Sequence, residues 1–456
     1  MTDAPALSAT QRNGAAVGQH SLPRYDWREI ARHNRKRDCW IVIDDVVYDV
    51  TAWVDRHPGG DIICTMAGDD ASALFHSSHF RDVSGRLQQY RIGVVESPAA
   101  ALVIDTPFLR TLKSRVHRYF RAHAVDYRRT RLLRPQLLGS IALFLAAWTA
   151  VYVFALYPFV VLMGLISCAL VGGFAHEYCH STLIHEGNRP NIKSLGCSVI
   201  WALVCPFMLE KHFQYEHLSH HKVPMDDAFD YEIFALRRVL RLSPEISWRP
   251  IFRYQQYYAP LVYAFYISTQ VIVGFTSNFF NKRNLSSDIS FWPQVYVMPA
   301  ITVVFHVALP IYLVGVSWWI VCFVSYNVVW QFFTYVVAAA VHMTSERDTR
   351  SDDWAYLVCS RSVNVLCGNR MYDWLSGGFN YQIDHHLLPT IAREHLPRIT
   401  HIVRQTCAEF GYPYKEYRSL GEYLRDHYRY LFRLGREGGQ IELAEGAGPP
   451  FGARSD

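Results

Sequence analysis

The sequence lacks the features that mark secreted, disulfide-stabilised or nucleic-acid-binding proteins. Its ten cysteines occur singly, with no Cys-x-x-Cys pair, which favours reduced cysteines in a reducing compartment. Residues 1–24 contain no apolar core of the signal-peptide type, so we expect membrane targeting to come from internal segments. The net charge of +5 over 456 residues is small, and no basic stripe is interleaved with aromatic residues. We therefore expect no nucleic-acid partner.

Two apolar runs are each long enough to cross a bilayer twice. Nearly every residue between Leu137 and Ala175 is apolar or small, and a helix of that length would measure about 58 Å, roughly twice a hydrocarbon core. The Tyr157-Pro158 dipeptide near its midpoint predicts a helical hairpin. Residues 294–341 form the second run, with a predicted break between Pro310 and Ser317. The pattern predicts four membrane-spanning helices.

Three clusters of histidine and glutamine accompany the apolar segments. Within each cluster the residues are three or four positions apart, which on a helix places their side chains on one face. From that face they can point at a common centre. Histidine is costly to bury next to a membrane unless it is paired or bound to a metal. The clusters predict a polynuclear metal site. The candidate ligands are His176, His180, His217, His220, His221, Gln382, His385 and His386.

A shared metal site restricts the membrane topology. The three clusters must lie on one membrane face, so only an even number of crossings can separate any two of them. Two ambiguous segments, Leu195–Leu209 and Tyr257–Phe275, are therefore predicted to be interfacial helices. The basic flank RRTRLLR, together with Arg361, Arg370 and Arg393, favours the cytosol for the face that carries the clusters.

Residues 25–96 combine β-like runs with turn residues. The segments DCWIVIDDVVYDVTAWVDRHPGG, AGDDASALFHSSHF and YRIGVV resemble a cytochrome b5 domain over its whole length, which implies a small α+β fold that binds haem b. The resemblance implies His57 and His79 as the axial ligands, since His79 lies four residues after a phenylalanine; His76 is the alternative. Two imidazoles on opposite sides of the iron leave no position for oxygen, so such a haem only passes electrons.

The histidine clusters resemble the three histidine boxes of membrane fatty acyl desaturases. The sequences that carry the resemblance are HEYCH, HLSHH and GGFNYQIDHHLLP, and it covers residues 107 to about 420. Gln382 replaces the first histidine of the third box. This replacement marks the front-end subgroup, whose members also carry an N-terminal cytochrome b5 domain. Two independent signals thus point to one family.

The desaturase resemblance implies two non-haem irons and O2 as co-substrate. The box histidines are the implied ligands, with Gln382 as a weaker or indirect contributor. His342 occupies the place of a further ligand in the wider superfamily, while Ala338 stands where some relatives carry an asparagine. Nearby carboxylates are expected either to orient the imidazoles or to be solvated at the membrane surface. These are Glu177, Asp226, Asp227 and Asp384.

The expected fold is multi-domain. A small α+β haem domain is followed by an all-α integral membrane domain with four transmembrane helices and a cytosolic cap. The expected boundaries are a disordered N-terminus (1–24), the haem domain (25–96), a linker (97–106), the desaturase domain (107–434) and a disordered tail (435–456). We expect an integral protein of the endoplasmic reticulum, with the haem domain and the boxes on the cytosolic face.

The sequence supports one main functional hypothesis and three alternatives. The hypothesis is a front-end desaturase that inserts a cis double bond between an existing double bond and the carboxyl end of a polyunsaturated acyl chain. The expected partners are NADH-cytochrome b5 reductase, membrane lipid, and a substrate carried by coenzyme A or phospholipid. The alternatives are a sphingolipid long-chain-base desaturase, a di-iron lipid hydroxylase, and an electron-transfer protein with a membrane anchor. The position of the new double bond is left open.

Overall fold

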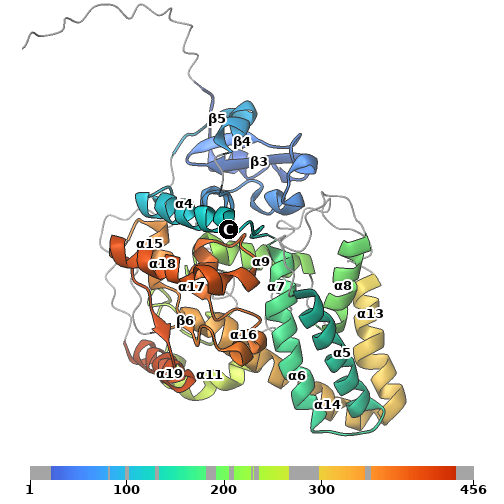
Figure 1. The fold of residues 1–456 in the computed structure, drawn as a ribbon. Helices are drawn as coiled ribbons and strands as arrows, with labels where there is room; N and C mark the ends of the chain where they lie inside the picture. The colour runs from blue at the N-terminus through green and yellow to red at the C-terminus, as the bar shows by residue number, and fades with distance from the viewer. Residues whose placement is uncertain are drawn as a thin grey trace, which may run out of the picture.

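The computed structural model describes most of the chain. The described residues are 22–80, 83–97, 102–128, 133–180, 192–204, 210–226, 230, 236–265, 297–344 and 351–437. Most of the two predicted disordered ends, 1–24 and 435–456, lies outside them. Figure 1 shows a small part that contains a sheet, drawn in blue, next to a larger helical part.

A five-stranded sheet forms the small part. Its strands are β1 (Arg24–Tyr25), β2 (Asn34–Arg35), β3 (Asp38–Ile43), β4 (Val46–Asp49) and β5 (Arg91–Val95), in the order β1-β5-β4-β3-β2. β1 and β5 are parallel, and the other neighbours are antiparallel. Asp44 and Asp45 join β3 to β4 with φ values of 50° and 61°, as a two-residue hairpin turn requires.

Short helices cover one face of this sheet. They include η1 (Val54–Arg56), η2 (Gly60–Met66), α2 (Ser72–Ser78) and α3 (Ser84–Leu87). Because strand side chains alternate between faces, Cys39, Ile41 and Ile43 of β3 share one face and pack in a core with residues of η1, η2 and α2. The predicted α+β domain is confirmed.

The first apolar run forms two helices joined at the predicted break. Its elements are α5 (Leu133–Tyr152), α6 (Phe159–Leu170), the π-helical turn η4 (Val171–Ala175) and α7 (His176–Cys179). Pro158 directly precedes α6, where a proline needs no intrahelical hydrogen bond. By length and composition, α5 and the helix from Phe159 to Cys179 could each cross a membrane.

The second apolar run forms a continuous series of helical elements. They are α13 (Met298–Val303), the π-helical turn η7 (Val304–Ala308), α14 (Leu309–Thr334), the π-helical turn η8 (Tyr335–Ala339) and η9 (Ala340–His342). These 45 residues form the third candidate membrane span. A straight helix of that length would measure about 67 Å, roughly twice a hydrocarbon core.

This series doubles back at Gly315. Gly315 has φ 78° and ψ 164°, a combination open in practice only to glycine. Across the turn, the indole Nε1 of Trp319 donates to the carbonyl oxygen of His306 at 2.8 Å, and the rings of His306 and Tyr326 stack 6.0 Å apart. The two halves therefore lie side by side, and the predicted break falls at Gly315. The total of four crossings stays a prediction.

Shorter helices lie between the two hairpins. They are α8 (Ile192–Val204), α9 (Glu210–Lys222), η5 (Pro250–Tyr254) and α11 (Gln255–Tyr263). The last carbonyls of α8, those of Ala202, Leu203 and Val204, accept hydrogen bonds from Thr302, His306 and Tyr326 respectively. The 13 residues of α8 measure about 20 Å, less than a hydrocarbon core, and the rest of the first segment predicted to be interfacial, residues 205–209, lies outside the described residues. The segment predicted as the second interfacial helix starts in α11 and continues outside the described residues.

Further helices form the cap of the larger part. They are α4 (Pro107–Ala122), α15 (Trp354–Ser360), α16 (Arg370–Leu375), α17 (Gln382–Leu387), α18 (Leu396–Phe410) and α19 (Leu420–Arg436). β6 (Asn364–Val365) and β7 (Glu416–Tyr417) form a parallel pair. On α4, Leu112, Val116 and Phe120 recur every four residues and are buried in one core with Ile399 and Val403 of α18.

The described end of the predicted linker is anchored to this cap. The backbone N–H of Val103 donates to the carbonyl of Asp352 at 2.7 Å, and the N–H of Trp354 donates to the carbonyl of Val103 at 3.1 Å. Thr106 then caps α4 by accepting a hydrogen bond from the N–H of Leu109. The N-terminal part of the linker, residues 98–101, lies outside the described residues.

Candidate metal centre and haem site

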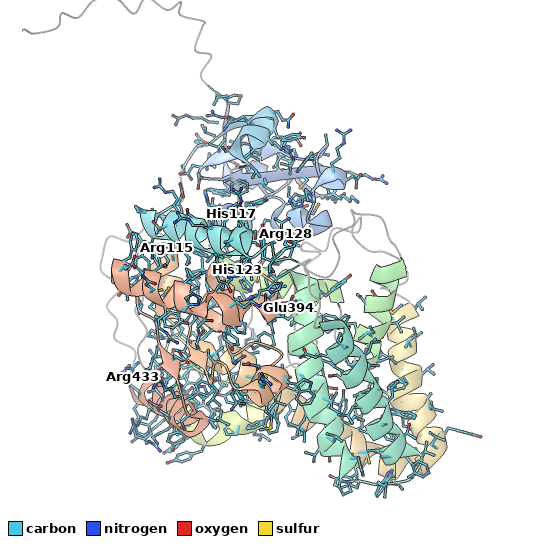
Figure 2. The ribbon with its side chains drawn as sticks, in the orientation of Figure 1. Arg115, His117, His123, Arg128, Glu394 and Arg433 are labelled. Atoms are coloured by element: carbon cyan, nitrogen blue, oxygen red, sulfur yellow. The ribbon has the colours of Figure 1, made fainter. Side chains whose placement is uncertain are left out.

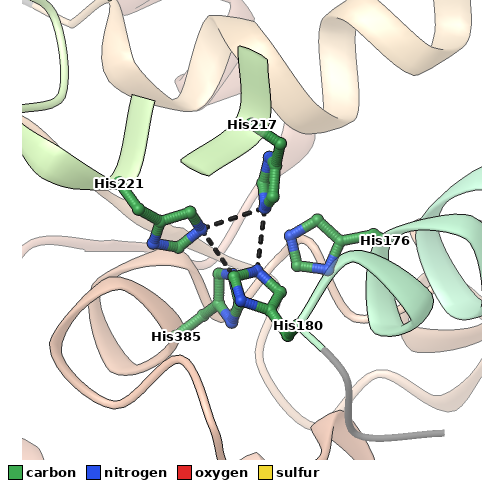
Figure 3. A group of neighbouring side chains, drawn as sticks. All are labelled: His176, His180, His217, His221 and His385. Carbon is green, nitrogen blue, oxygen red and sulfur yellow. Dashed lines mark hydrogen bonds between the residues drawn. The ribbon is translucent and has the colours of Figure 1, made fainter. Parts of the chain in front are cut away.

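Eight buried imidazoles gather into two groups. In each group the candidate ligand atoms all lie within 4.8 Å of one another. The first group, drawn in Figure 3, contains His176, His180, His217, His221 and His385. The second contains His220, His342 and His386. Every histidine predicted as a metal ligand thus belongs to one of the two groups.

Helical spacing divides the boxes between the groups. On α9, His217 and His221 are four residues apart and both enter the first group, whereas His220 enters the second. On α17, the adjacent residues His385 and His386 divide in the same way. The rings of His221 and His386 stack 4.2 Å apart, so the two groups are immediate neighbours.

Two membrane helices deliver histidines through π-helical turns. η4 directly precedes His176, and η8 leads through η9 to His342. A π-helical turn changes the direction in which the following side chains point, and such turns are frequent at functional sites. The helix from the first apolar run therefore leads to His176 and His180 of the first group, and the helix from the second run leads to His342 of the second group.

The first group has the nitrogen spacing of ligands around one metal. The Nε2 atom of His217 lies 2.8 Å from Nε2 of His180 and 3.0 Å from Nε2 of His221. Nε2 of His221 is also 3.1 Å from Nε2 of His385. Two nitrogens that bind one metal at about 2.1 Å and at right angles are about 3.0 Å apart. The donor set therefore fits a metal ion.

The protonation of these histidines also suits a metal. Burial, together with the positive charge of Arg393, lowers the pKa of His180 to about 3. Burial likewise lowers the pKa of His217 and His385, so the imidazoles are neutral and able to bind a metal. In the described part of the chain, the buried Nε2 atoms of His176 and His386 have no hydrogen-bond partner, an arrangement that metal binding would compensate.

Gln382 lies against the second group. Its amide Nε2 lies 3.0 Å from Nε2 of His342, which in turn lies 3.2 Å from Nε2 of His220. The side chain is buried at 2 % exposure. The side-chain amide has an oxygen that accepts hydrogen bonds and a nitrogen that donates them. Gln382 can therefore bind a metal in the second group directly or hold a neighbouring ligand by a hydrogen bond.

Hydrogen bonds to the Nδ1 atoms of two histidines orient the rings of the second group. Nδ1 of His220 lies 2.7 Å from Oδ2 of Asp230, and both side chains are buried. Nδ1 of His342 donates to the carbonyl of Arg361 at 2.9 Å. Such bonds fix the tautomer and leave Nε2 facing the metal. Asp230 is not among the residues predicted from the sequence, where its only signal is its place as the last acid of the segment DDAFD.

Two of the four carboxylates named from the sequence, those of Glu177 and Asp384, have partners outside the histidine groups. Oε1 of Glu177 lies 3.3 Å from Nε of Arg393, in a buried pair. Oδ2 of Asp384 accepts hydrogen bonds from Asn364 at 2.5 Å and Tyr414 at 3.2 Å. Burial raises the pKa of Asp384 to about 7. Asp226 accepts the backbone N–H of Asp230 through its carbonyl, and Asp227 lies outside the described residues.

Two of the arginines predicted to flank the membrane on the cytosolic side are buried instead. Arg361 is 4 % exposed and donates to the carbonyl of Pro224 at 3.1 Å. Arg393 is 5 % exposed, lies over the ring of Phe379, and places Nη2 2.6 Å from Nδ1 of His176. They were misassigned because a pattern of charges does not distinguish a membrane flank from a buried partner of the site.

His57 and His79 face each other in the sheet-containing part. Their ring centroids are 6.3 Å apart, which is about the separation expected when one iron binds both Nε2 atoms. Nδ1 of His57 donates to the carbonyl of Gly60 at 3.0 Å, and Nδ1 of His79 to that of Phe75 at 2.8 Å. These bonds leave both Nε2 atoms for the iron.

The surroundings of the two histidines fit a haem. Burial lowers the pKa of His57, and it lowers that of His79 to about 4, so both rings are neutral. They line a cavity of about 770 Å³ together with apolar side chains that include Ile41 and Phe75. The alternative ligand, His76, instead lies 2.9 Å from Asp44.

Comparisons with known proteins match both parts of the chain. Residues 152–418 match the family model described as fatty acid desaturase. The chain belongs to the fatty acid desaturase family. Residues 26–96 match the model of the cytochrome b5-like haem/steroid binding domain. The resemblance to a cytochrome b5-fused fatty acid desaturase is thus confirmed.

Relatives match this desaturase along nearly its whole length. It is 27 % identical over 443 residues to Delta(5) fatty acid desaturase A of Dictyostelium discoideum, with 91 % of this chain and 94 % of the relative covered. It is 26 % identical over 451 residues to an acyl-lipid (8-3)-desaturase of Mortierella alpina, with 92 % and 99 % covered. A solved structure, cytochrome b5 of Ostreococcus tauri virus 2, shares 37 % identity and covers 16 % of this chain and 95 % of its own, with a TM-score of 0.15.

Family membership settles the class of reaction and the cofactors. The protein is an oxygen-dependent oxidoreductase of the membrane, with haem b in the cytochrome b5-like domain and two non-haem irons in the desaturase domain. Within the described residues, three long apolar helices agree with an integral membrane protein.

Proposed function

We propose that this desaturase is a front-end enzyme that inserts a cis double bond between an existing double bond and the carboxyl end of an acyl chain. The observation that carries the proposal is Gln382, which replaces a box histidine and lies against His342 in a chain that also contains a haem domain. Relatives named Delta(5) fatty acid desaturase A and acyl-lipid (8-3)-desaturase, matched over about nine-tenths of both chains, support it.

We assign one iron to each histidine group. The first iron would be held by His176, His180, His217, His221 and His385, and the second by His220, His342 and His386, with Gln382 as a weaker ligand. With O2, bound iron supplies an oxidant strong enough to remove hydrogen from an unactivated methylene group, which no amino-acid side chain provides. The protein holds the imidazoles neutral and buried, and it orients His220 through Asp230 and His342 through the carbonyl of Arg361.

We assign the axial positions of the haem to His57 and His79. Each turnover would use one O2, two electrons from the substrate and two further electrons, which the haem held by these residues would pass on singly. The proposed source of these electrons is NADH-cytochrome b5 reductase. The acyl substrate would be carried by coenzyme A or by phospholipid.

We propose four membrane crossings with the metal groups on the cytosolic face of the endoplasmic reticulum. His176 and His342 end the two apolar hairpins and enter neighbouring groups, so an even number of crossings separates them. The turn at Gly315 and the turn before Pro158 supply one hairpin each, which supports this topology.

The test is lipid analysis of a host that lacks such products. Cells that express the protein would be fed fatty acids that differ in the position of the first double bond, and the new double bond would be located by mass spectrometry. We expect it on the carboxyl side of the existing one. A hydroxylated product would favour the lipid hydroxylase, and a new double bond in sphingoid bases alone would favour the long-chain-base desaturase.

A further inference from the structure

The cavity that contains His57 and His79 extends to the desaturase domain. Its lining includes His180 and Leu218 next to the first metal group, and Pro389 and Thr390 directly after the third box. His117 and Arg128, labelled in Figure 2 just below the haem domain, complete this side of the lining. A haem held between His57 and His79 would therefore share one cavity with a predicted iron ligand.

A charge pair joins the two domains beside this cavity. Nζ of Lys222 lies 3.1 Å from Oδ1 of Asp69. Lys222 directly follows His221, and its carbonyl accepts a hydrogen bond from Nε1 of Trp354 at 2.9 Å, so its backbone is held in place at the end of α9. The side chain of Asp69 is half exposed, so the pair adds little to stability. Its larger effect is to select one orientation of the two surfaces.

Hydrogen bonds to the backbone around His79 fix the same orientation. Thr390 Oγ1 donates to the carbonyl of Ser78 at 3.2 Å, and Nζ of Lys113 donates to the carbonyl of His79 at 3.1 Å. These donors come from the loop after α17 and from α4, both in the desaturase domain. The domain thus holds the segment that carries one predicted haem ligand.

We propose that this surface is the electron-transfer interface between the haem domain and the metal groups, and that Lys222 and Asp69 position it. The proposal rests on the electron path of the proposed function. One electron would cross at a time, with the haem iron oxidised by one unit and a non-haem iron reduced by one unit, and no bond would form or break. Lys222 and Asp69 do not touch the reacting groups; they are positioning residues.

The first test is structural and uses the full chain in detergent. A carbodiimide joins a carboxylate to an amine only when the two are in contact, so mass spectrometry should find an amide between Asp69 and Lys222. The Asp69→Asn variant should lose this product. Absence of the cross-link in the unaltered protein would overturn the docked arrangement, whether or not the protein proves to be a front-end desaturase.

The second test measures how fast reduced haem is reoxidised when O2 and lipid substrate are added. Asp69→Lys should slow this step about tenfold, because it places two positive charges opposite each other, without changing the haem spectrum or the iron content. The double variant Asp69→Lys/Lys222→Asp should restore the rate. Asp55→Lys is the matched control, since Asp55 pairs with Lys36 within the haem domain. Equal rates in Asp69→Lys and Asp55→Lys would overturn the proposal.

Discussion

At the scale of single residues, Gln382 decides how the second metal group differs from a site made only of histidines. An amide binds iron more weakly than an imidazole does, but it can accept and donate hydrogen bonds. We expect Gln382→His to retain part of the activity, because it keeps a nitrogen within reach of the site. Gln382→Ile has similar bulk and no polar atom, so it should lose nearly all activity and part of the iron.

Product analysis and iron determination at matched expression would check these two variants. Activity in the isoleucine variant equal to that of the unaltered protein would show that Gln382 only fills space. The front-end assignment would then depend on the fused haem domain alone.

A second prediction at this scale concerns Asp230. Its Oδ2 atom is 2.7 Å from Nδ1 of His220 and accepts the backbone N–H of Met225 at 2.7 Å. Asp230→Ala removes both bonds, so His220 loses its orientation, and iron affinity should fall about 10- to 100-fold. Asp230→Asn keeps one side-chain oxygen, so its iron affinity should fall less than that of the alanine variant. Titration of the purified protein with Fe²⁺ would check this, and normal affinity in the alanine variant would exclude the role of Asp230.

The histidines could be found from the sequence, but their partners could not. Spacings of three and four residues place imidazoles on one side of α9 and α17, which is a local property of a helix. Asp230 and Arg393 act through contacts that depend on where the chain returns in space. His79 was preferred over His76 by family spacing, and the structure adds the reason that His76 turns toward Asp44.

At the scale of elements, two glycine pairs let the first and third boxes approach. Gly172 and Gly173 lie in η4, before His176, and Gly377 and Gly378 lie before α17. A Cβ atom on Gly172 would overlap the carbonyl oxygen of Ser376, and one on Gly377 would overlap the backbone of Gly173. The close contact of these backbones positions His176 relative to His385.

Gly172→Ala should therefore separate the two boxes. The added methyl group meets backbone atoms rather than a flexible side chain, and such overpacking costs about 1–3 kcal/mol. We expect a lower unfolding temperature in detergent and a loss of bound iron. Gly139→Ala in α5 is the control, because nothing lies within 4 Å of a Cβ atom at that glycine. Equal iron content in the two variants would contradict the prediction.

The two apolar hairpins could be predicted from the sequence, but the π-helical turns at the ends of their helices could not. Apolar length together with Pro158 and Gly315 is enough to predict two hairpins, since both residues interrupt a helix locally. The π-helical turns before His176 and His342 have no such local signal. They depend on how each helix packs where it leaves the bundle.

At the scale of the whole molecule, motifs identified the two domains but not their contact. The haem domain and the histidine boxes each carry a pattern of their own. Asp69 and Lys222 are 153 residues apart, and a single acid and a single base on two surfaces form no pattern in the sequence. The shared cavity is visible only once both domains are folded and docked.

This shared cavity makes a final prediction about Arg128, which comes from the desaturase domain and lines the haem cavity. Its positive charge contributes to lowering the pKa of both His57 and His79, after the larger effect of burial. The same charge disfavours ferric haem, which carries one more positive charge than ferrous haem. Arg128→Gln should therefore lower the midpoint potential of the haem, by roughly tens of millivolts.

Spectroelectrochemistry of the full chain would measure this shift in midpoint potential. Arg118→Gln is the control, because Arg118 is an exposed residue of α4 outside the cavity lining. An unchanged potential in Arg128→Gln would mean that the desaturase domain does not tune the haem through this charge.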